Sequence, residues 1–245
     1  MLNSHRLATL TFCCITAISS TLSAEEETPK WKHEIDVGIN GSTGNSKTIN
    51  LHLGYTGNYK DADHRWKLIS AHDKAKSDGE ESSNQFYTDL LKDWYFNDSP
   101  WIAFLEGRYD WDEFKDWDYR TTVSSGAGYE FIDNDSWNLT GRLGLGGNKT
   151  YGDADEEITA EALFALEGAW TISGREAVDF KTTFYPSLEE SGEYRNISTF
   201  NWKMTMLEQD RLAMKIGLRT EYDSSATAGT KTHDFKYNVS LVWGL

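Results

Sequence analysis

The sequence predicts an all-β fold, a single transmembrane antiparallel β-barrel of about 12 strands with periplasmic termini. Three observations lead to this prediction. Apolar and polar residues alternate along most segments of the chain. These segments are about as long as the 9–11 residues with which a tilted strand crosses a bilayer. The chain also has 10 Trp, 12 Tyr and 11 Phe despite a mean hydropathy of −0.61, as two aromatic girdles at membrane interfaces would require.

The stretch 31–66 shows the repeating unit most clearly. Its apolar positions are Trp31, Ile35, Val37 and Ile39 in a first run and Ile49, Leu51, Leu53 and Tyr55 in a second. Successive side chains of a strand point to opposite faces, so this stretch predicts a hairpin with one apolar and one polar face. The alternation returns in 137–145, 211–219 and 234–245. In 84–96 the alternation is ambiguous, because both faces carry large apolar residues. They are Phe86, Leu90 and Trp94 on one face and Tyr87, Leu91 and Tyr95 on the other.

The predicted strands are 31–42, 46–60, 65–76, 84–96, 101–112, 119–131, 137–149, 158–171, 177–188, 194–206, 211–223 and 232–245. Their connections alternate in kind. One set is short and polar: 61–64, 97–100, 132–136, 172–176 and 207–210. The other set is generally longer: 77–83, 113–118, 150–157, 189–193 and 223–231. Short turns at one rim, longer loops at the other, and both termini on the short-turn side are the layout of an outer-membrane barrel.

Residues 1–24 are predicted to be a cleaved signal peptide, and residues 25–245 to form the barrel. Arg6 precedes a mainly apolar run, and small residues then lead to Ser23 and Ala24, as in secretory signals. The two cysteines of the chain, Cys13 and Cys14, lie in this segment. The predicted mature chain therefore forms no disulfide and offers no thiolate to a metal.

The formal net charge of −15 disfavours nucleic acid as a partner, because polyanions repel one another. We interpret the excess of acidic residues as a means of keeping exposed loops soluble. No apolar run near 20 residues follows the N-terminal segment, which excludes a bundle of transmembrane helices.

Tryptophans recur at a regular interval in the first half of the chain. Trp31, Trp66, Trp101 and Trp137 are separated by 35, 35 and 36 residues, and each begins a predicted strand. Equivalent positions on alternate barrel strands lie at one height, so these residues predict a girdle at one membrane interface. Trp170 and Trp243 end other strands near the same rim. Residues expected at the opposite rim are Tyr109, Trp111, Tyr119, Phe184, Tyr222 and Phe235. The alternative is a soluble β-sandwich with an aromatic core.

The polar face of the strands carries the charged residues that we expect inside the barrel. They are Glu106, Arg108, Asp110, Arg120, Glu130, Arg142, Glu161, Lys203, Lys215 and Arg219, with Glu167, Arg211 and Lys236 as further members. Such a lining can form a narrow pore that discriminates between small hydrophilic solutes by charge. Alternatively, the charges pair across the lumen and plug it. Strand number leaves both alternatives open, since about eight strands enclose only side chains and about sixteen leave a channel.

The other candidate sites are weaker. The histidines of the predicted barrel show no metal-ligand spacing. His52 or His72 could serve as the base of a barrel-embedded lipid or peptide hydrolase, but no nucleophile motif accompanies them. Acidic clusters at 78–81 and 153–157 could hold divalent cations, although neither has the complete calcium-loop pattern. The sequence therefore predicts no catalytic residue, metal site or cofactor.

The chain also resembles a known family. The resemblance lies in the first hairpin with its Ser42-Thr43-Gly44-Asn45 connection, the Arg65-Trp66 strand and the closing strand to Trp243. These features resemble the YdiY-like proteins of the outer membrane, often labelled salt-induced outer-membrane proteins. The resemblance covers most of the predicted mature chain and implies an outer-membrane barrel of a Gram-negative bacterium, without established catalytic or binding residues.

The family label implies a role under osmotic or ionic stress. Outer-membrane proteins commonly end in an aromatic residue, which resembles an assembly signal. Here the chain ends in Val242-Trp243-Gly244-Leu245, so the aromatic is displaced to Trp243.

The predicted function is non-enzymatic, either a narrow pore for small hydrophilic solutes or ions, or a stress-related envelope protein. The alternatives are a plugged structural or binding barrel and, less favoured, an outer-membrane hydrolase. The predicted partners are outer-membrane lipids and lipopolysaccharide, the outer-membrane assembly machinery, and small hydrophilic solutes or divalent cations.

Overall fold

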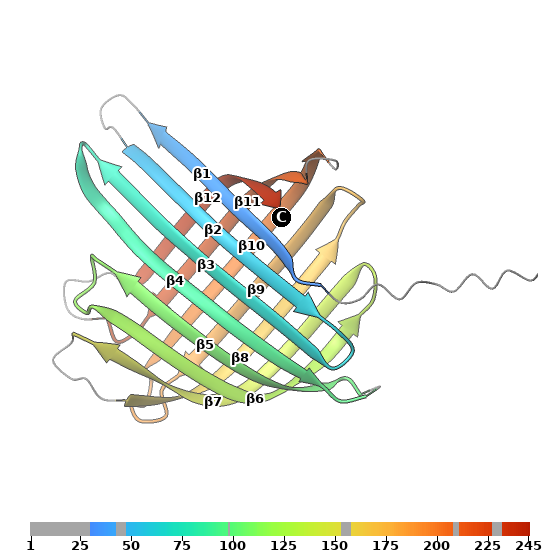
Figure 1. Ribbon diagram of the computed structural model, residues 1–245. Helices are drawn as coiled ribbons and strands as arrows, with labels where there is room; N and C mark the ends of the chain where they lie inside the picture. The colour runs from blue at the N-terminus through green and yellow to red at the C-terminus, as the bar shows by residue number, and fades with distance from the viewer. Residues whose placement is uncertain (1–29, 43–47, 98, 153–157, 208–210, 227–231) are drawn as a thin grey trace, which may run out of the picture.

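The computed structural model describes residues 30–42, 48–97, 99–152, 158–207, 211–226 and 232–245. It confirms the all-β prediction, because twelve antiparallel strands close into one barrel (Figure 1). The strands are β1 (Lys32–Ser42), β2 (Thr48–Lys60), β3 (His64–Ser77), β4 (Glu80–Tyr95), β5 (Trp101–Asp112), β6 (Tyr119–Asp133), β7 (Trp137–Tyr151), β8 (Ile158–Thr171), β9 (Glu176–Pro186), β10 (Tyr194–Leu207), β11 (Leu212–Asp223) and β12 (His233–Gly244). The predicted signal peptide lies outside the described residues.

Each strand pairs with its neighbours in sequence, and β1 pairs with β12 to close the barrel. The closing register sets Ile35 opposite Trp243 and Val37 opposite Leu241, so apolar side chains of the first and last strands share the outer face. The amide of Leu245 adds a hydrogen bond of 2.8 Å to the carbonyl oxygen of His33. This closing contact pairs Glu34–Gly38 with Ser240–Gly244 and so joins the two ends of the sheet, as a barrel requires. Across the described ranges, helices long and apolar enough to cross a membrane are absent.

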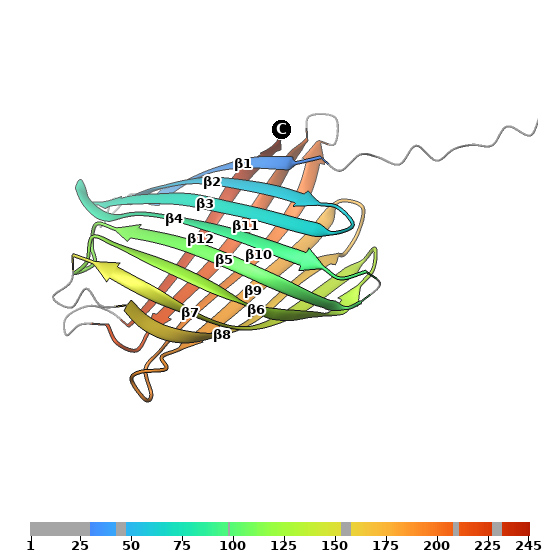
Figure 2. The same cartoon turned by 60° about the horizontal axis from the view of Figure 1, so that its bottom comes forward.

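The two faces of the wall differ in polarity as the alternation predicts. Outward residues remain exposed, for example Val123 at 58% and Leu145 at 64%, whereas the inward Glu106 and Arg142 are buried. The strands of the near wall cross those of the far wall (Figure 2), so side chains from distant parts of the chain meet inside. For β4 the structure resolves the ambiguity: Leu91 and Asp93 are buried, while Leu90 on the other face is 43% exposed.

Short turns and both ends of the strand series lie at one rim, which we call the short-turn rim. Its connections are residues 61–63, 96–100, 134–136, 172–175 and 208–211. The opposite rim, the long-loop rim, carries the described connections 78–79, 113–118 and 187–193 and the strand ends at Ser42, Thr48, Tyr151, Ile158, Asp223 and His233. The short-turn rim includes the pairing of Glu34 with Gly244, so the first and last strands begin and end there.

One expectation about the loops is wrong. The segment 77–83 is not a long connection, because β3 and β4 continue into it and leave only Asp78 and Gly79 as the turn. Both residues have positive φ, 52° and 92°. This is the backbone that a two-residue hairpin turn requires and that an Asp-Gly pair adopts readily.

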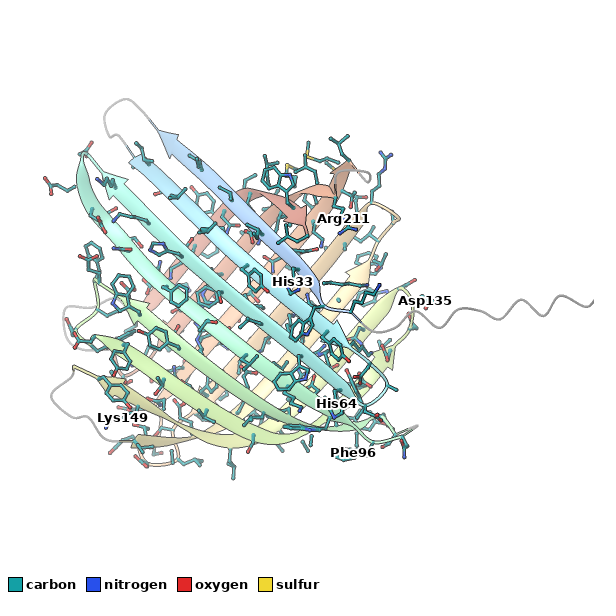
Figure 3. The ribbon with its side chains drawn as sticks, in the orientation of Figure 1. His33, His64, Phe96, Asp135, Lys149 and Arg211 are labelled. Carbon is teal, nitrogen blue, oxygen red and sulfur yellow. The ribbon has the colours of Figure 1, made fainter. Side chains whose placement is uncertain are left out.

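Arg211 is also misplaced by the sequence pattern. It lies outside β11, with a φ of 50°, and its side chain is exposed. Figure 3 shows it at the short-turn rim rather than inside the barrel. Its carbonyl oxygen accepts a hydrogen bond from the amide of Gly244 at 3.0 Å. The alternation fails here because the strand has not yet begun, so the period of two does not extend to this residue.

Close approach of the wall to an inward ring requires glycine at position 144. A Cβ atom there would lie 2.5 Å from the carbonyl oxygen of Ser125 and 2.7 Å from the ring of Phe104. At Gly107, by contrast, a Cβ would meet no atom within 4 Å. We expect Gly144→Ala to lower the free energy of unfolding by about 1–3 kcal/mol, as overpacking does.

Urea titration in detergent micelles, followed by tryptophan fluorescence, measures this loss. Gly107→Ala is the matched control and should unfold like the unmodified protein. Equal stability of the two variants would contradict the close approach at Gly144.

Candidate functional site in the barrel lumen

The half of the lumen near the short-turn rim contains a buried ion-pair network. Arg142 on β7 donates to both carboxylate oxygens of Asp93 on β4, at 3.2 and 2.8 Å, and to Glu167 on β8 at 2.9 Å. Arg65 on β3 lies 2.9 Å from Asp93 and 2.7 Å from Glu167. Lys67 donates to Glu167 at 2.8 Å. The network joins distant parts of the wall, since β3 and β8 are five strands apart in the closed sheet.

Apolar side chains fill the lumen beside this network. Leu91, Phe104, Leu163, Ala165 and Tyr185 form one buried cluster, with Ile197 packed against it. These residues come from β4, β5, β8, β9 and β10. The alternation predicts a polar inward face and therefore does not predict this cluster. The pattern held a signal, however, since Phe104 has the same parity as Glu106 and Arg108.

The middle of the lumen combines charged and aromatic residues. Lys181 donates to both oxygens of Glu106 at 2.9 and 2.8 Å. Arg108 donates to Asp89 at 2.7 Å. Its guanidinium carbon also lies 4.9 Å from the ring centre of Tyr87, and that of Arg219 lies 4.0 Å from the same ring. Tyr87 therefore contacts two cations from different strands, β5 and β11.

Toward the long-loop rim the charges are again paired across strands. Arg195 on β10 binds both oxygens of Glu161 on β8, at 2.9 and 2.7 Å. Arg120 on β6 donates to Asp223 at the end of β11 at 3.0 Å. Lys115 in the connection between β5 and β6 donates to Asp234 on β12 at 2.8 Å. This half of the lumen is thus crossed by ion pairs as well.

The wall formed by β1, β2 and β3 carries a histidine between two carboxylates. His52 lies 3.0 Å from Asp36 through Nε2 and 2.5 Å from Asp73 through Nδ1. Lys215 on β11 lies 2.7 Å from Asp36. This arrangement is a paired network, because the carboxylate of Asp36 already has a histidine and a lysine as partners.

The residues that the alternation assigns to the lumen have the following positions. Glu106, Arg108, Arg142, Glu161, Glu167 and Arg219 are buried, and Asp110, Arg120, Glu130, Lys203, Lys215 and Lys236 are partly buried. Lys203 donates to Glu34 at 2.7 Å, Arg219 to Glu221 at 2.6 Å, and Asp110 accepts from Arg108 at 2.7 Å. The sequence pattern did not identify Arg65, Tyr87 or Asp93 as lumen residues. Tyr87 and Asp93 lie on β4, and only the structure shows which face of β4 points inward.

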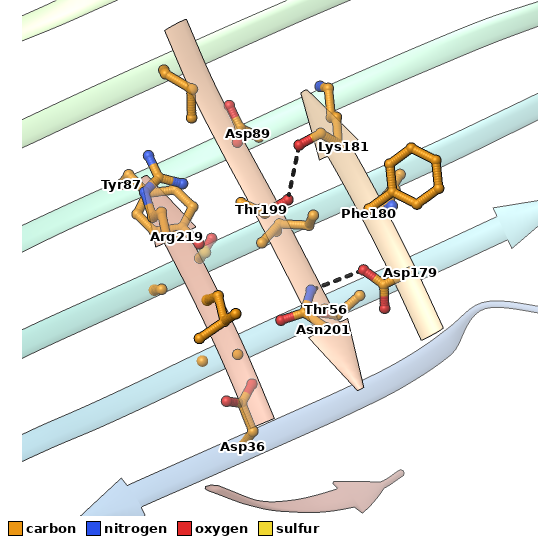
Figure 4. A pocket seen from close by; sticks show the side chains of 18 of the residues that line it. Asp36, Thr56, Tyr87, Asp89, Asp179, Phe180, Lys181, Thr199, Asn201 and Arg219 are labelled. Atoms are coloured by element: carbon orange, nitrogen blue, oxygen red, sulfur yellow. Dashed lines mark hydrogen bonds between the residues drawn. The ribbon is translucent and has the colours of Figure 1, made fainter. Parts of the chain in front are cut away.

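Three cavities lie within the barrel. The first, of about 300 Å³, reaches from Glu34 and Lys203 near the short-turn rim to Arg219 (Figure 4). The second, of about 390 Å³, lies toward the long-loop rim and shares Tyr87, Tyr185 and Ile197 with the first. The third, of about 780 Å³, shares His52, Asp73 and Lys236 with the first, and the outward-facing Leu51, Phe235 and Tyr237 also border it. Shared lining residues place the three cavities next to one another.

Aromatic residues mark both rims on the outside. Of the predicted girdle, Trp31, Trp101, Trp137, Trp170 and Trp243 are 38–56% exposed, and Trp66 is partly exposed. Trp137 stacks on Trp170 with ring centres 4.9 Å apart. Near the long-loop rim Tyr119 stacks on Tyr151 at 4.4 Å. Rings of this kind are typical of membrane interfaces.

The hydrolase and metal hypotheses gain no support. The hydrogen bonds described for His52 and His72 lead to Asp73 and to Asn84, not to a serine. Among the residues that the structure describes, no cluster of His, Cys, Asp and Glu is arranged to hold a metal ion. In the first acidic cluster Glu81 is paired with Lys74 at 2.8 Å, and the second cluster, 153–157, lies outside the described residues.

The Arg142 network gives a prediction about stability. The side chain of Arg142 is 0% exposed. Arg142→Ala would remove one cationic partner from the carboxylates of Asp93 and Glu167. We expect this change to lower the free energy of unfolding by about 3–5 kcal/mol, as removal of one partner from a buried ion pair does. Denaturant unfolding in detergent micelles measures the loss.

Lys60→Ala is the control, because its pair with Asp133 at the short-turn rim is half exposed and should contribute less than about 1 kcal/mol. An Arg142→Ala protein as stable as the Lys60→Ala protein would show that the network contributes little.

Comparisons with known proteins agree with this architecture. The structure resembles the NanC porin, with a TM-score of 0.50 and 11% identity over 86% of this chain and 100% of that chain. Two further similar structures are the translocator domain of the autotransporter NalP from Neisseria meningitidis (TM-score 0.44, 11% identity, 87% and 86% coverage) and an outer membrane channel from Pseudomonas putida F1 (0.46, 8%, 88% and 94%). The first of these likenesses shows the fold of an outer-membrane barrel.

No protein with a curated description matches the sequence. A family model described as "Protein of unknown function, DUF481" matches residues 35–245. The match covers every strand except the first residues of β1, and the family is consistent with the YdiY-like resemblance. The chain belongs to the DUF481 family of proteins of unknown function.

Proposed function

We propose that this protein is a non-enzymatic barrel of the bacterial outer membrane whose lumen is a narrow pore for small hydrophilic solutes or ions. One observation carries the proposal: neighbouring cavities, which share lining residues, follow one another from the short-turn half of the lumen to the long-loop rim. Their lining combines polar and charged groups with aromatic and aliphatic ones such as Tyr185 and Ile197, and the polar groups can bind solutes that leave water.

Two narrow places along this path would control passage. The first and second cavities meet at Tyr87, Tyr185 and Ile197. The first and third meet beside His52, Asp73 and Lys236. Because most charges near the path are already paired, the pore would discriminate mainly by size and hydrogen bonding rather than by net charge.

The proposed membrane position follows from the outer surface. Apolar side chains between two aromatic rims would contact outer-membrane lipids, with the long loops toward lipopolysaccharide and the termini in the periplasm. The assembly machinery would receive the closing strand, in which Trp243 points outward with 41% exposure. A role under osmotic or ionic stress remains what the family label implies. Divalent cations as partners are not part of the proposal.

A plugged structural or binding barrel is the second candidate. The observation that favours it is the set of ion pairs that cross the lumen, from Arg65 to Glu167 and from Arg120 to Asp223. Together with the apolar cluster around Phe104, these pairs confine open space to the remaining part of the lumen. The two candidates differ in whether folded, inserted protein conducts.

Conductance in a planar bilayer separates the two candidates. We expect discrete current steps from the inserted protein, measured in salts of different ion size. Tyr185→Ala should increase the conductance, because Tyr185 lines both the first and the second cavity. Tyr109→Ala removes an aromatic ring that stacks on Tyr119 in the long-loop girdle and should leave the conductance unchanged.

Silence from protein shown to be folded and inserted would overturn the pore and support the plugged barrel. An equal effect of the two tyrosine substitutions would refute the position of the narrow place.

Membrane insertion has its own test. Leu143 lies near the middle of β7 and is 57% exposed on the outer face. An arginine at the lipid-facing midplane costs about 2–4 kcal/mol, so Leu143→Arg should lower stability in lipid vesicles by this amount. Asp135→Arg, in the turn at the short-turn rim (Figure 3), is the control. Equal stability of both variants in vesicles would argue against a bilayer around β7.

A further inference from the structure

The first and last strands are paired over only part of their length. Within the described parts of both strands, Cα partners join Glu34–Gly38 to Ser240–Gly244 and end there. β1 nevertheless continues over residues 39–42 along β2, and β12 begins with residues 233–239 along β11. We call this junction of residues 39–42 with 233–239 the seam. It lies toward the long-loop rim, and its two strand edges are not paired with each other.

The third cavity extends from the lumen to the outer face at the seam. On β12 both the inward Lys236 and the outward Tyr237 border it, and on β2 both His52 and Leu51 do. Successive side chains of a strand point to opposite faces, so a cavity that touches both kinds reaches both faces of the wall. Tyr237 is four residues from the start of β12 at His233, which is about 13 Å along a strand. The opening therefore extends well below the rim.

The outer surface around the seam is apolar. Ile39 on β1 is 71% exposed, and Phe235 and Tyr237 on β12 are 58% and 67% exposed. In the proposed membrane position, these side chains contact hydrocarbon. Lipid cannot satisfy the backbone groups of an unpaired strand edge, and such backbone persists at membrane depth only beside a polar cavity or within protein. The seam thus needs polar groups on its inner side and apolar groups on its outer side.

The inner side of the third cavity is polar, and its charged groups already have partners. The pairs are His52 with Asp73 at 2.5 Å, Lys115 with Asp234 at 2.8 Å, and Lys236 with Gln85. A charged ligand would compete with these pairs. A hydroxyl group both donates and accepts, so it can bind beside them without adding a charge.

We propose that the third cavity binds a single-chain amphiphile with an uncharged, hydroxylated head, and that the seam is its lateral entrance from the lipid. The chain lies along Leu51, Phe235 and Tyr237, and the head reaches the polar groups beside His52 and Lys236. The cavity volume of about 780 Å³ is within the about 300–1,000 Å³ of small-molecule pockets.

This proposal rests on the proposed membrane position, but it does not need conduction along the lumen. An amphiphile that enters through the seam can bind in a plugged barrel as well as in a pore. The two proposals therefore require separate measurements.

Disulfide formation in phospholipid vesicles tests whether the seam is open. Both native cysteines lie in the predicted signal peptide, so introduced cysteines would be the only thiols of the mature chain. Continued pairing beyond Gly38 would set Gly41 opposite Tyr237. We expect Gly41→Cys with Tyr237→Cys to form a disulfide at least about 5-fold more slowly than Val37→Cys with Leu241→Cys, because a disulfide needs close Cα atoms.

The second pair is the matched control, since Val37 and Leu241 are opposite each other in the closing register. Mass spectrometry of the oxidised protein measures both rates. Equal rates would show that the seam is closed and would overturn the lateral entrance.

Photolabelling in the same vesicles tests the site, with a monolauroylglycerol that carries a diazirine on its glycerol head as the probe. We expect label on inward residues of the third cavity such as Gln85, and suppression of this label by excess unmodified monolauroylglycerol. Laurate and dodecyltrimethylammonium, which carry opposite charges, should suppress it less. Ser83→Phe should lower the label roughly 3- to 10-fold, because the ring takes up space that the head needs.

Thr159→Phe is the matched control for Ser83→Phe. Ser83 lines the third cavity, whereas Thr159 lines the second, so Thr159→Phe should be labelled like the unmodified protein. Retained far-ultraviolet circular dichroism shows that each variant is folded.

Three outcomes would overturn the amphiphile site. They are label confined to outward residues, an equal effect of the two phenylalanine variants, and better suppression by either charged amphiphile. An open seam without inward label rejects the amphiphile and favours a strand of another protein as the occupant. Suppressible inward label without current steps supports the site and rejects the pore, and current steps without inward label support the pore and reject the site.

Discussion

The pairing of β1 with β12 is the constraint on which the rest of the structure depends. It places Val37 opposite Leu241 and Ile35 opposite Trp243, and it converts twelve consecutive hairpin partners into a closed wall. Closure pairs the edges of the first and last strands over Glu34–Gly38 and Ser240–Gly244, and lipid could not satisfy the backbone groups of such edges. Closure also creates an inside, so that residues far apart in sequence become neighbours across the lumen.

The inside is neither an open tube nor a uniform core. Where Arg142, Asp93 and Glu167 meet, charged groups are withdrawn from water and compensate one another. Beside them, Phe104 and Leu163 pack as in a soluble protein interior. The cavities extend along the remaining wall, where β1, β2 and β11 contribute side chains such as Asp36, His52 and Lys215 that pair at the wall. The lumen therefore has a filled part and an open part.

This division accounts for how a barrel of intermediate strand number can hold a solute-sized space. Aromatic side chains such as Tyr87 and Tyr185 border two cavities at once, and arginines from neighbouring walls hold them through cation–π contacts. The same arginines are engaged by carboxylates, so their charge is largely balanced.

The sequence by itself determined the strands, their approximate ends and the inward parity of Glu106, Arg142 and Lys215, because a period of two is a local property of an extended backbone. It did not assign β4, where both faces carry aromatic and leucine side chains, and it wrongly assigned Arg211, which precedes its strand, to the lumen. Only the tertiary structure decided that Arg65 meets Glu167 and that Phe104 joins an apolar cluster. These contacts depend on register and closure, which bring together strands that the local pattern cannot relate.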